Sequence, residues 1–209
     1  MKPSKYFFRL FVLAMSIFSL ASCGTSPDLD LESDDSGDMI INGGTATVDM
    51  DQILAEYPAQ PSMMTPSIEE WLKYMREEEK VARDLYLAFY RKNSHRTFNN
   101  ISRSEQIHMN AILRLMNVYG IEDPASSREG VFTNPDLQKL YDQLLAQGNI
   151  SLKEALKVGV LVEETDIADL DDVYGLNPPR NVQTVAEALL AGSKNHLRAF
   201  TFALGRISF

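Results

Sequence analysis

Residues 102–110 read SRSEQIHMN and place a carboxylate, Glu105, three residues before an imidazole, His108. Ile101 and Ile112 fall on the same stripe when the segment is helical, because residues three and four apart share one face of a helix. A lone buried carboxylate is costly, so it must be paired, protonated or bound to a metal ion. The stretch therefore predicts a helix whose inward face carries polar chemistry as well as apolar packing.

The helical period continues on both sides of this stretch. We expect helices at about residues 65–90, 98–119 and 135–148, a third long helix from the capping box at Ser151 and Glu154, and a fourth over about residues 182–203. The sequence shows no strand pattern of any length. A long crossover, containing the short helix, separates the second and third long helices. The predicted fold is therefore all-α, a four-helix bundle.

Three further polar residues interrupt the apolar stripes of the other long helices, namely Glu79, Glu163 and His196. A solvated helix edge explains one such residue. Acids on three helices and imidazoles on two favour a metal site instead, because carboxylate oxygen and imidazole nitrogen suit iron or manganese. The spacing of Glu105 and His108 lets one helix present both ligands.

Sequence spacing tests whether these residues lie at one height. Glu163 and His196 are equally far from the turn at residues 178–179, so an antiparallel hairpin there would bring them level. The point midway between Glu79 and Glu105 falls only two residues beyond the expected helix end at residue 90, which strains that pairing.

Five segments resemble the ferritin-like superfamily, specifically an uncharacterised bacterial branch known as a domain of unknown function. They lie within about residues 67–205 and read EEEKVARDLYLAFY (77–90), SRSEQIHMNAI (102–112), GVFTNPDLQKLYDQL (130–144), VLVEETDIADL (160–170) and GSKNHLRAF (192–200). The resemblance implies a ferritin-like bundle with a di-metal site. A Glu from each of two helices and a Glu-x-x-His from each of the other two supply its ligands.

The resemblance carries over to individual residues, and the first-helix segment is similar to the rubrerythrin motif. The implied metal ligands are Glu79, Glu105, His108, Glu163 and His196, with Glu78, Glu164 and Asp166 as less certain candidates. The stripe favours Glu163 over its neighbour. Ser193 stands where the family has a Glu, three residues before His196, so at most five of the six usual ligands are present unless Asp166 or a second acid of EEE fills in. One metal, a weak second site and no metal all remain open.

The resemblance implies a redox protein that holds iron or manganese, possibly two ions. Its expected partners are metal ions and a small oxidant, and its expected reaction is oxidation of Fe(II) or consumption of peroxide or oxygen. The alternative is a non-catalytic binding or structural bundle with a buried polar network. The net charge of -9 argues against nucleic acid, because a phosphate-binding surface needs clustered cations.

The N-terminal residues predict export. Residues 1–22 combine three cations, an apolar run and the sequence LASC, which ends at the single cysteine, Cys23. This resembles a bacterial lipobox, which implies lipidation at Cys23 and a cell-envelope protein anchored to a membrane, facing the periplasm or the cell surface. An ordinary secretory signal is the alternative. The acidic, proline-containing residues 23–66 predict a disordered tether, or an export signal, ahead of the domain at 67–205.

Overall fold

The computed structural model of the protein describes residues 48–207. These residues form six α-helices and two short 3-10 helices, and they contain no β-strand. The prediction of an all-α protein is confirmed. The predicted signal segment, Cys23 and residues 24–47 lie outside the described residues, so the predictions made for them stay predictions.

Local signals set the ends of the first two long helices. Helix α3 spans Pro66–Asn93, and the side chain of Thr65 caps its first turn. It ends at Ser94, which adopts a left-handed φ of 53°. Helix α4 spans Arg96–Tyr119 and ends at Gly120, whose φ of 68° is left-handed and costs a glycine little.

The remaining helices begin at signals that the sequence also carries. Helix α5 spans Pro135–Gly148, helix α6 spans Leu152–Asp171 and helix α7 spans Arg180–Ile207. Of the two hydrogen bonds of the predicted capping box, the one made by the serine is confirmed: the hydroxyl oxygen of Ser151 accepts from the backbone N–H of Glu154 at 3.1 Å.

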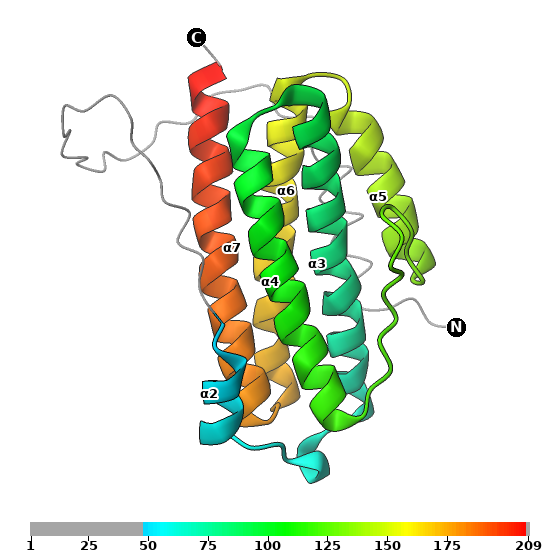
Figure 1. Ribbon diagram of the computed structural model, residues 1–209, viewed down its shortest axis with the longest axis vertical. Coiled ribbons are helices and arrows are strands. Elements are labelled where there is room, and N and C mark those ends of the chain that lie inside the picture. Colours follow the sequence, from blue (N-terminus) through cyan, green and yellow to red (C-terminus); the bar gives the residue numbers. More distant parts are fainter. Residues whose placement is uncertain (1–47, 208–209) are drawn as a thin grey trace, which may run out of the picture. The chain divides into compact units, whose positions relative to one another are not determined.

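The four long helices lie side by side, as Figure 1 shows. Helix α3 packs against α4 and α6, and α7 packs against the same two helices from the other side. Helix α5 lies outside, against α3 and α6. The connection after α4 and the helix α5 carry the chain back along the length of the helices, so α4 and α6 run in the same direction.

Large apolar side chains from all four long helices fill the space between them. Fully buried members include Leu72, Met75, Leu85, Phe89, Phe98, Ile112, Leu115, Val158, Leu189 and Phe200. Helices α6 and α7 come close enough that a methyl group at Gly159 would lie 2.7 Å from the ring of Phe200. The burial of these side chains is the main driving force for the packing.

The connection between α4 and α5 is fastened to the outer face of α3. Arg76 forms a two-pronged ion pair with Asp123, with its shorter contact at 2.9 Å. Glu77 accepts the backbone N–H groups of Thr133 and Asn134 at 2.6 and 2.9 Å. These bonds satisfy polar backbone groups that would otherwise compete for water.

A buried ion pair lies at the centre of the same face. Lys80 and Asp84 are one helical turn apart, both are fully buried, and their charged atoms are 2.5 Å apart. Lys80 also donates to the carbonyl of Arg128 at 2.9 Å, and Asp84 accepts from the N–H of Gly130 at 2.9 Å. Arg83 adds a second cation to Asp84 at 2.7 Å. The pair therefore links two successive turns of α3 and also ties α3 to the connection between α4 and α5.

The segment before α3 corrects one prediction. Residues 23–66 were expected to be a disordered tether, but helix α2 spans Met50–Glu56 and a 3-10 helix, η2, spans Pro61–Met63. Helix α2 packs on α7 (Figure 1), and the N–H of Gln60 donates to the hydroxyl of Tyr119 at 3.2 Å. The short segment MDQILAE follows an aspartate cap, Asp49, and contains good helix formers. These signals were overlooked because the acidic sequence before them favoured disorder. None of the helices within residues 48–207 has the length and apolar character that crossing a bilayer requires.

The buried ion pair leads to a stability prediction. Replacing Asp84 by Ala should lower the free energy of unfolding by about 3–5 kcal/mol, because it leaves the buried ammonium of Lys80 without its counter-charge. Urea unfolding of the purified protein, followed by circular dichroism, measures this loss.

The matched control is the exposed ion pair of Lys73 and Glu69, which has the same one-turn spacing. Replacing Glu69 by Ala should cost no more than about 0.5 kcal/mol, since water screens the pair. Equal losses in the two variants would contradict the role assigned to Asp84.

Candidate metal centre

Five polar side chains from four helices meet inside the bundle interior. Helix α3 contributes Glu79, helix α4 contributes Glu105 and His108, helix α6 contributes Glu163, and helix α7 contributes His196. None is more than 5% exposed. The apolar stripes position four of them, which lie three or four residues from a buried apolar side chain on their own helix, whereas the stripe neighbours of Glu163, Val160 and Ile167, are half-buried. The stripes therefore predicted their inward orientation, and the structure places them there.

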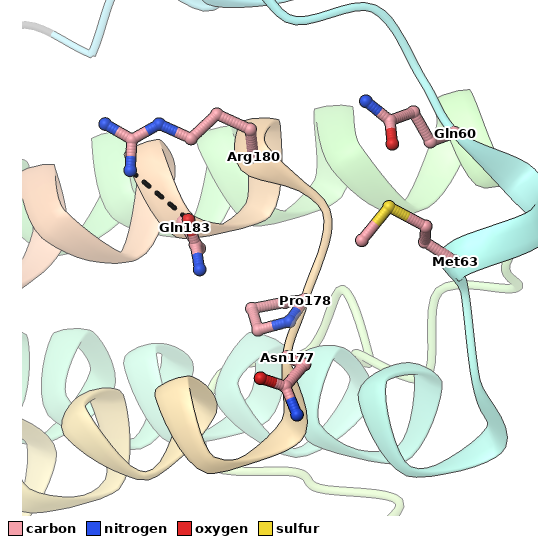
Figure 2. Close-up of a pocket in the computed structure, with 6 residues that line it drawn as sticks. All are labelled: Gln60, Met63, Asn177, Pro178, Arg180 and Gln183. Carbon is pink, nitrogen blue, oxygen red and sulfur yellow. Dashed lines mark hydrogen bonds between the residues drawn. The ribbon is translucent and has the colours of Figure 1, made fainter.

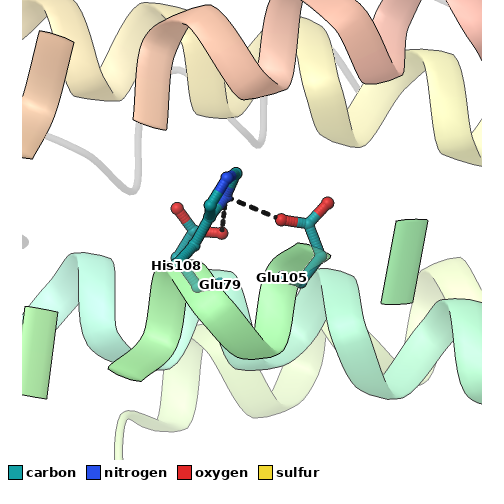
Figure 3. Close-up of side chains that lie close together, drawn as sticks. All are labelled: Glu79, Glu105 and His108. Carbon is teal, nitrogen blue, oxygen red and sulfur yellow. Dashed lines mark hydrogen bonds and ion pairs between the residues drawn. The ribbon is translucent and has the colours of Figure 1, made fainter. Parts of the chain in front are cut away.

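The first group joins α3 to α4. Figure 3 shows the imidazole of His108 lying between the carboxylates of Glu79 and Glu105. Its Nδ1 is 2.9 Å from Glu105 Oε2 and 3.2 Å from Glu79 Oε2. One ring nitrogen thus faces two carboxylates from two helices.

The second group uses the other oxygen of Glu105 and joins α4, α6 and α7. Glu105 Oε1 is 2.9 Å from Nδ1 of His196, and the same nitrogen is 3.5 Å from Oε2 of Glu163. The rings of His108 and His196 are stacked, with their centroids 5.4 Å apart. Glu105 is therefore shared by both groups and lies at their centre.

The turn between α3 and α4 explains how the first group comes level. The point midway between Glu79 and His108 falls at the junction of Asn93 and Ser94, where α3 ends. Glu79 is therefore opposite His108, with Glu105 one turn away on the same helix face. The strain expected for a direct pairing of Glu79 with Glu105 disappears. Glu163 and His196 are level, as their spacing predicted.

The two groups have the chemistry of a metal site. In each, three ligand atoms lie within 4.8 Å of one another: those of Glu79, Glu105 and His108 in one, and those of Glu105, Glu163 and His196 in the other. Glu79 Oε1 is buried and accepts no hydrogen bond. Carboxylate oxygens and imidazole nitrogens at this separation fit a divalent cation in each group, with the shared carboxylate between them.

Burial and mutual charge shift the acid–base equilibria of these groups. Burial raises the pKa of Glu79 to about 7, against the opposing pull of His108. Burial likewise raises the pKa of Glu163 to about 7, helped by the charge of Glu105. Burial works in the same direction on Glu105, but its two imidazole neighbours overcome it and hold the pKa of Glu105 well below its usual range.

The imidazoles shift in the opposite sense. Burial disfavours the charged ring of His196, but the carboxylates of Glu105 and Glu163 outweigh it and raise the pKa of His196 to about 10. Burial by itself lowers the pKa of His108, but the carboxylates of Glu79 and Glu105 outweigh this effect and raise it above its usual value. At neutral pH both imidazoles therefore carry a proton on the side where a cation would bind.

Two residues support the five. The hydroxyl of Tyr86 donates to Glu163 Oε1 at 2.7 Å and fixes the direction of that carboxylate. Gly192 makes room for His108, because a methyl group there would lie 2.7 Å from its Nε2. Tyr86 follows Glu79 by seven residues, two turns of α3, so both lie on the same face of that helix. The role of Gly192 was missed, although its position four residues before His196 on the same helix face was a usable signal.

The less certain candidates separate clearly. Glu164 is exposed, as its position next to Glu163 requires, since adjacent residues point about 100° apart on a helix. Glu78 is buried in a neighbouring acidic group, where burial and the charges of Asp169 and Asp166 raise its pKa. Asp166 is buried beside Ser193, whose hydroxyl donates to its Oδ2 at 2.5 Å.

A surface pocket lies away from these residues, near the start of α7. Figure 2 shows its lining, and its volume is about 350 Å³. Its lining residues are Gln60, Met63, Asn177, Pro178, Arg180 and Gln183. Arg180 is bonded there to Gln183 at 3.2 Å and pairs with Glu187 at 3.1 Å. None of the five candidate ligands lines this pocket.

Known proteins are similar to this chain in sequence and in fold. "Uncharacterized protein MJ0754" from the archaeon Methanocaldococcus jannaschii is 42% identical over 150 residues, which cover 71% of this chain and 80% of that protein. The crystal structure of the hypothetical protein MJ0754 aligns with a TM-score of 0.70 over 72% of this chain and 86% of that one. A crystal structure of a DUF305 fragment from Deinococcus radiodurans, 16% identical, aligns with a TM-score of 0.53 over 68% of this chain and 97% of that one, which shows the fold alone.

A family match covers most of the described residues. Residues 69–206 match the uncharacterized protein domain DUF2202. The archaeal relative corrects the expectation of a purely bacterial branch. The chain belongs to the DUF2202 family.

Proposed function

We propose that this protein is a metal-binding protein of ferritin-like, four-helix-bundle architecture that holds two divalent cations. The observation that carries the proposal is the position of Glu105, whose two oxygens each lie 2.9 Å from Nδ1 of a different histidine. A carboxylate in that position can bridge two cations, and each imidazole can then bind one of them. Glu79 and Glu163 complete the set from the remaining two helices.

The energetic cost of the arrangement supports a bound cation. Three carboxylates lie buried in one interior, and burial opposes the charged form of each. The two imidazolium ions offset part of this cost, but Glu79 and Glu163 still have pKa values near 7. A divalent cation brings two positive charges to one position and can offset two carboxylates at once. Structural bundles rarely need so many ionisable groups at one height.

We propose iron or manganese as the metal, because mixed oxygen and imidazole ligands without thiolates suit these ions. When bound, such a pair exchanges electrons with a small oxidant, which supports oxidation of Fe(II) or consumption of peroxide or oxygen. Around it, Tyr86 holds Glu163 through its hydroxyl, and the packed rings of Phe98 and Phe200 beside Tyr86 exclude water from that side.

The location of the protein remains part of the proposal. The LASC sequence and its single cysteine support lipidation at Cys23 and attachment to a membrane of the cell envelope. The acidic composition supports a partner that is a cation or small oxidant, and argues against nucleic acid.

Thermal melting tests the metal site. Anaerobic Fe(II) or Mn(II), at about 100 times its Kd, should stabilise the protein by about 2.7 kcal/mol for each ion bound, since a cation that binds only the folded state shifts the equilibrium toward it. For a domain of this size the melting temperature should rise by roughly 5–10 °C per ion. His108→Ala should remove most of this rise.

The third histidine provides the matched control. His95 precedes the first residue of α4, makes no capping hydrogen bond with its side chain and belongs to neither group, so His95→Ala should keep the full metal-dependent rise. Glu105→Ala should lose the rise although it removes a charge from a crowded interior. If added metal leaves the wild-type melting temperature unchanged, the centre is a hydrogen-bonded polar network and the proposal fails.

Gly192 gives a second test that leaves every ligand in place. Gly192→Ala should displace the ring of His108 and weaken Mn(II) binding by about tenfold or more, in the range seen when residues around a metal ligand are changed. Isothermal titration calorimetry measures the change in affinity.

Gly205 lies on the same helix, and a methyl group added there would meet nothing within 4 Å, so Gly205→Ala is the control. It should leave the Mn(II) affinity unchanged and, if anything, favour the helix. Equal affinities in both variants would contradict the contact between residue 192 and the imidazole.

Metal binding should also depend on pH. Because the pKa of His196 is raised to about 10, this ring carries a proton at pH 7 that a cation must displace. Affinity should therefore rise as the pH increases from about 6 to about 9, with release of protons at pH 7. Calorimetry in buffers of different ionisation enthalpy counts the released protons, and His95→Ala should not change that number. A binding enthalpy that is the same in every buffer would contradict this account.

A further inference from the structure

Ser193 marks a gap in the ligand set that the resemblance implies. It lies three residues before His196 on α7, it is fully buried, and it therefore faces the same interior. A hydroxyl carries no charge and cannot replace a carboxylate as an anionic ligand. Five ligand groups serve two cation positions, and Glu105 alone is shared between them.

The structure places another acid beside this gap. Asp166 follows Glu163 by three residues on α6, so both project from one face of that helix. Ser193 Oγ lies 2.5 Å from Asp166 Oδ2 and 3.0 Å from the carbonyl of Leu189. A hydroxyl has one proton to donate, and the shorter distance to a charged acceptor favours the carboxylate.

The second oxygen of Asp166 has no hydrogen-bond partner. The residue is only 5% exposed, and its Oδ1 is buried without a hydrogen bond. An unsatisfied buried carboxylate oxygen is costly, so a native structure that keeps one commonly uses it. Burial first, and then the charges of Glu79 and Glu163, raise the pKa of Asp166. Asp166 thus interacts with carboxylates of the centre as well as with Glu78 in the neighbouring acidic group.

We propose that Asp166 is the missing carboxylate ligand of the metal centre, supplied by α6 in place of α7, with Ser193 as the residue that positions it. This inference rests on the proposed metal-binding function. Helix α6 then offers Glu163 and Asp166 one turn apart, and α7 offers His196 alone. In the structure Asp166 belongs to neither group of three, so its Oδ1 would have to shift to reach a bound cation, while Ser193 would hold Oδ2 through its hydrogen bond.

The size of Ser193 is part of the argument. A glutamate at this position would fill the space next to Asp166 and bring a second negative charge against it. A serine leaves room for the aspartate and gives it a hydrogen bond. The fourth carboxylate thus comes from α6 instead of α7, and the number of carboxylates around the two proposed cation positions remains four.

Binding of Mn(II) to the purified protein, without oxygen at neutral pH, tests the proposal. Metal analysis after gel filtration counts the ions, and electron paramagnetic resonance distinguishes a coupled Mn(II) pair from single ions. Wild-type protein should hold two ions and show the coupled spectrum. Asp166→Asn, which keeps the shape and loses the charge, should hold one ion or bind the second at least tenfold more weakly.

Asp169→Asn is the matched control. Asp169 is a buried acid one turn further along α6, near Tyr74 and Glu78, and its replacement should leave two ions bound. Ser193→Ala should weaken the second ion by about tenfold without removing any ligand, as expected for a positioning residue. The double variant Asp166→Ser with Ser193→Glu returns the acid to α7 and should restore two ions and the coupled spectrum.

The outcomes separate this inference from the proposed function. Two ions bound with unchanged affinity in Asp166→Asn would overturn the role of Asp166 and leave the metal centre intact. A single ion in the wild type would overturn the role of Asp166 and reduce the proposed function from two ions to one, and no ion in the wild type would overturn metal binding altogether. Circular dichroism checks that each variant folds. If Asp166→Asn does not fold, the other two variants decide. The proposal fails if Ser193→Ala binds the second ion with unchanged affinity, or if the double variant holds only one ion.

Discussion

The position of Glu105 is the constraint on which the rest of the interior depends. One buried carboxylate forms ion pairs with two imidazoles, each at 2.9 Å, and those imidazoles belong to different helices. His108 then reaches Glu79 on α3, and His196 reaches Glu163 on α6. All four long helices are thereby held in one register, because a slip of one turn in any of them would leave a buried charge without a partner. Such a misplaced charge is far more costly than a lost apolar contact, so polar groups here can specify the packing that the apolar residues drive.

The same groups set up a competition between protons and cations. Without a cation, protons on the two imidazoles and on part of the carboxylates keep the interior close to electrically neutral. Under the proposed function, a divalent cation would displace these protons, and the same carboxylates and imidazoles would hold it. Whether protons or metal ions neutralise the interior would then depend on pH and on the supply of metal.

Sequence periodicity identified one face of each helix and little more. It found Glu79, Glu105, His108, Glu163 and His196, because each interrupts an apolar stripe, and it separated Glu163 from Glu164. It did not find that Glu77, Lys80 and Asp84 are also buried, because their burial comes from a connection that is remote in sequence and has no period of its own. Helix α2 was missed for a related reason, since seven residues contain too few turns to establish a pattern. The sequence named Asp166 as a possible substitute for the acid missing at position 193, but the hydrogen bond between Ser193 and Asp166 joins two helices and cannot be predicted from the pattern of either one.

The connection between α4 and α5 has an evolutionary consequence. Loops on a protein surface usually accept insertions and drift in length. This one supplies the backbone groups that complete a charged face of α3, through Arg128, Gly130, Thr133 and Asn134. These residues are exposed or half-buried, but their backbone groups complete the hydrogen bonds of buried charges on α3, so changes in the length of the connection should be selected against as strongly as changes in a helix. Variation should instead accumulate at the turn between α5 and α6, where Ile150 is 74% exposed. The irregular connection between α4 and α5 should thus be constrained in length, while the exposed hydrophobic residue Ile150 marks the turn that should tolerate the most change.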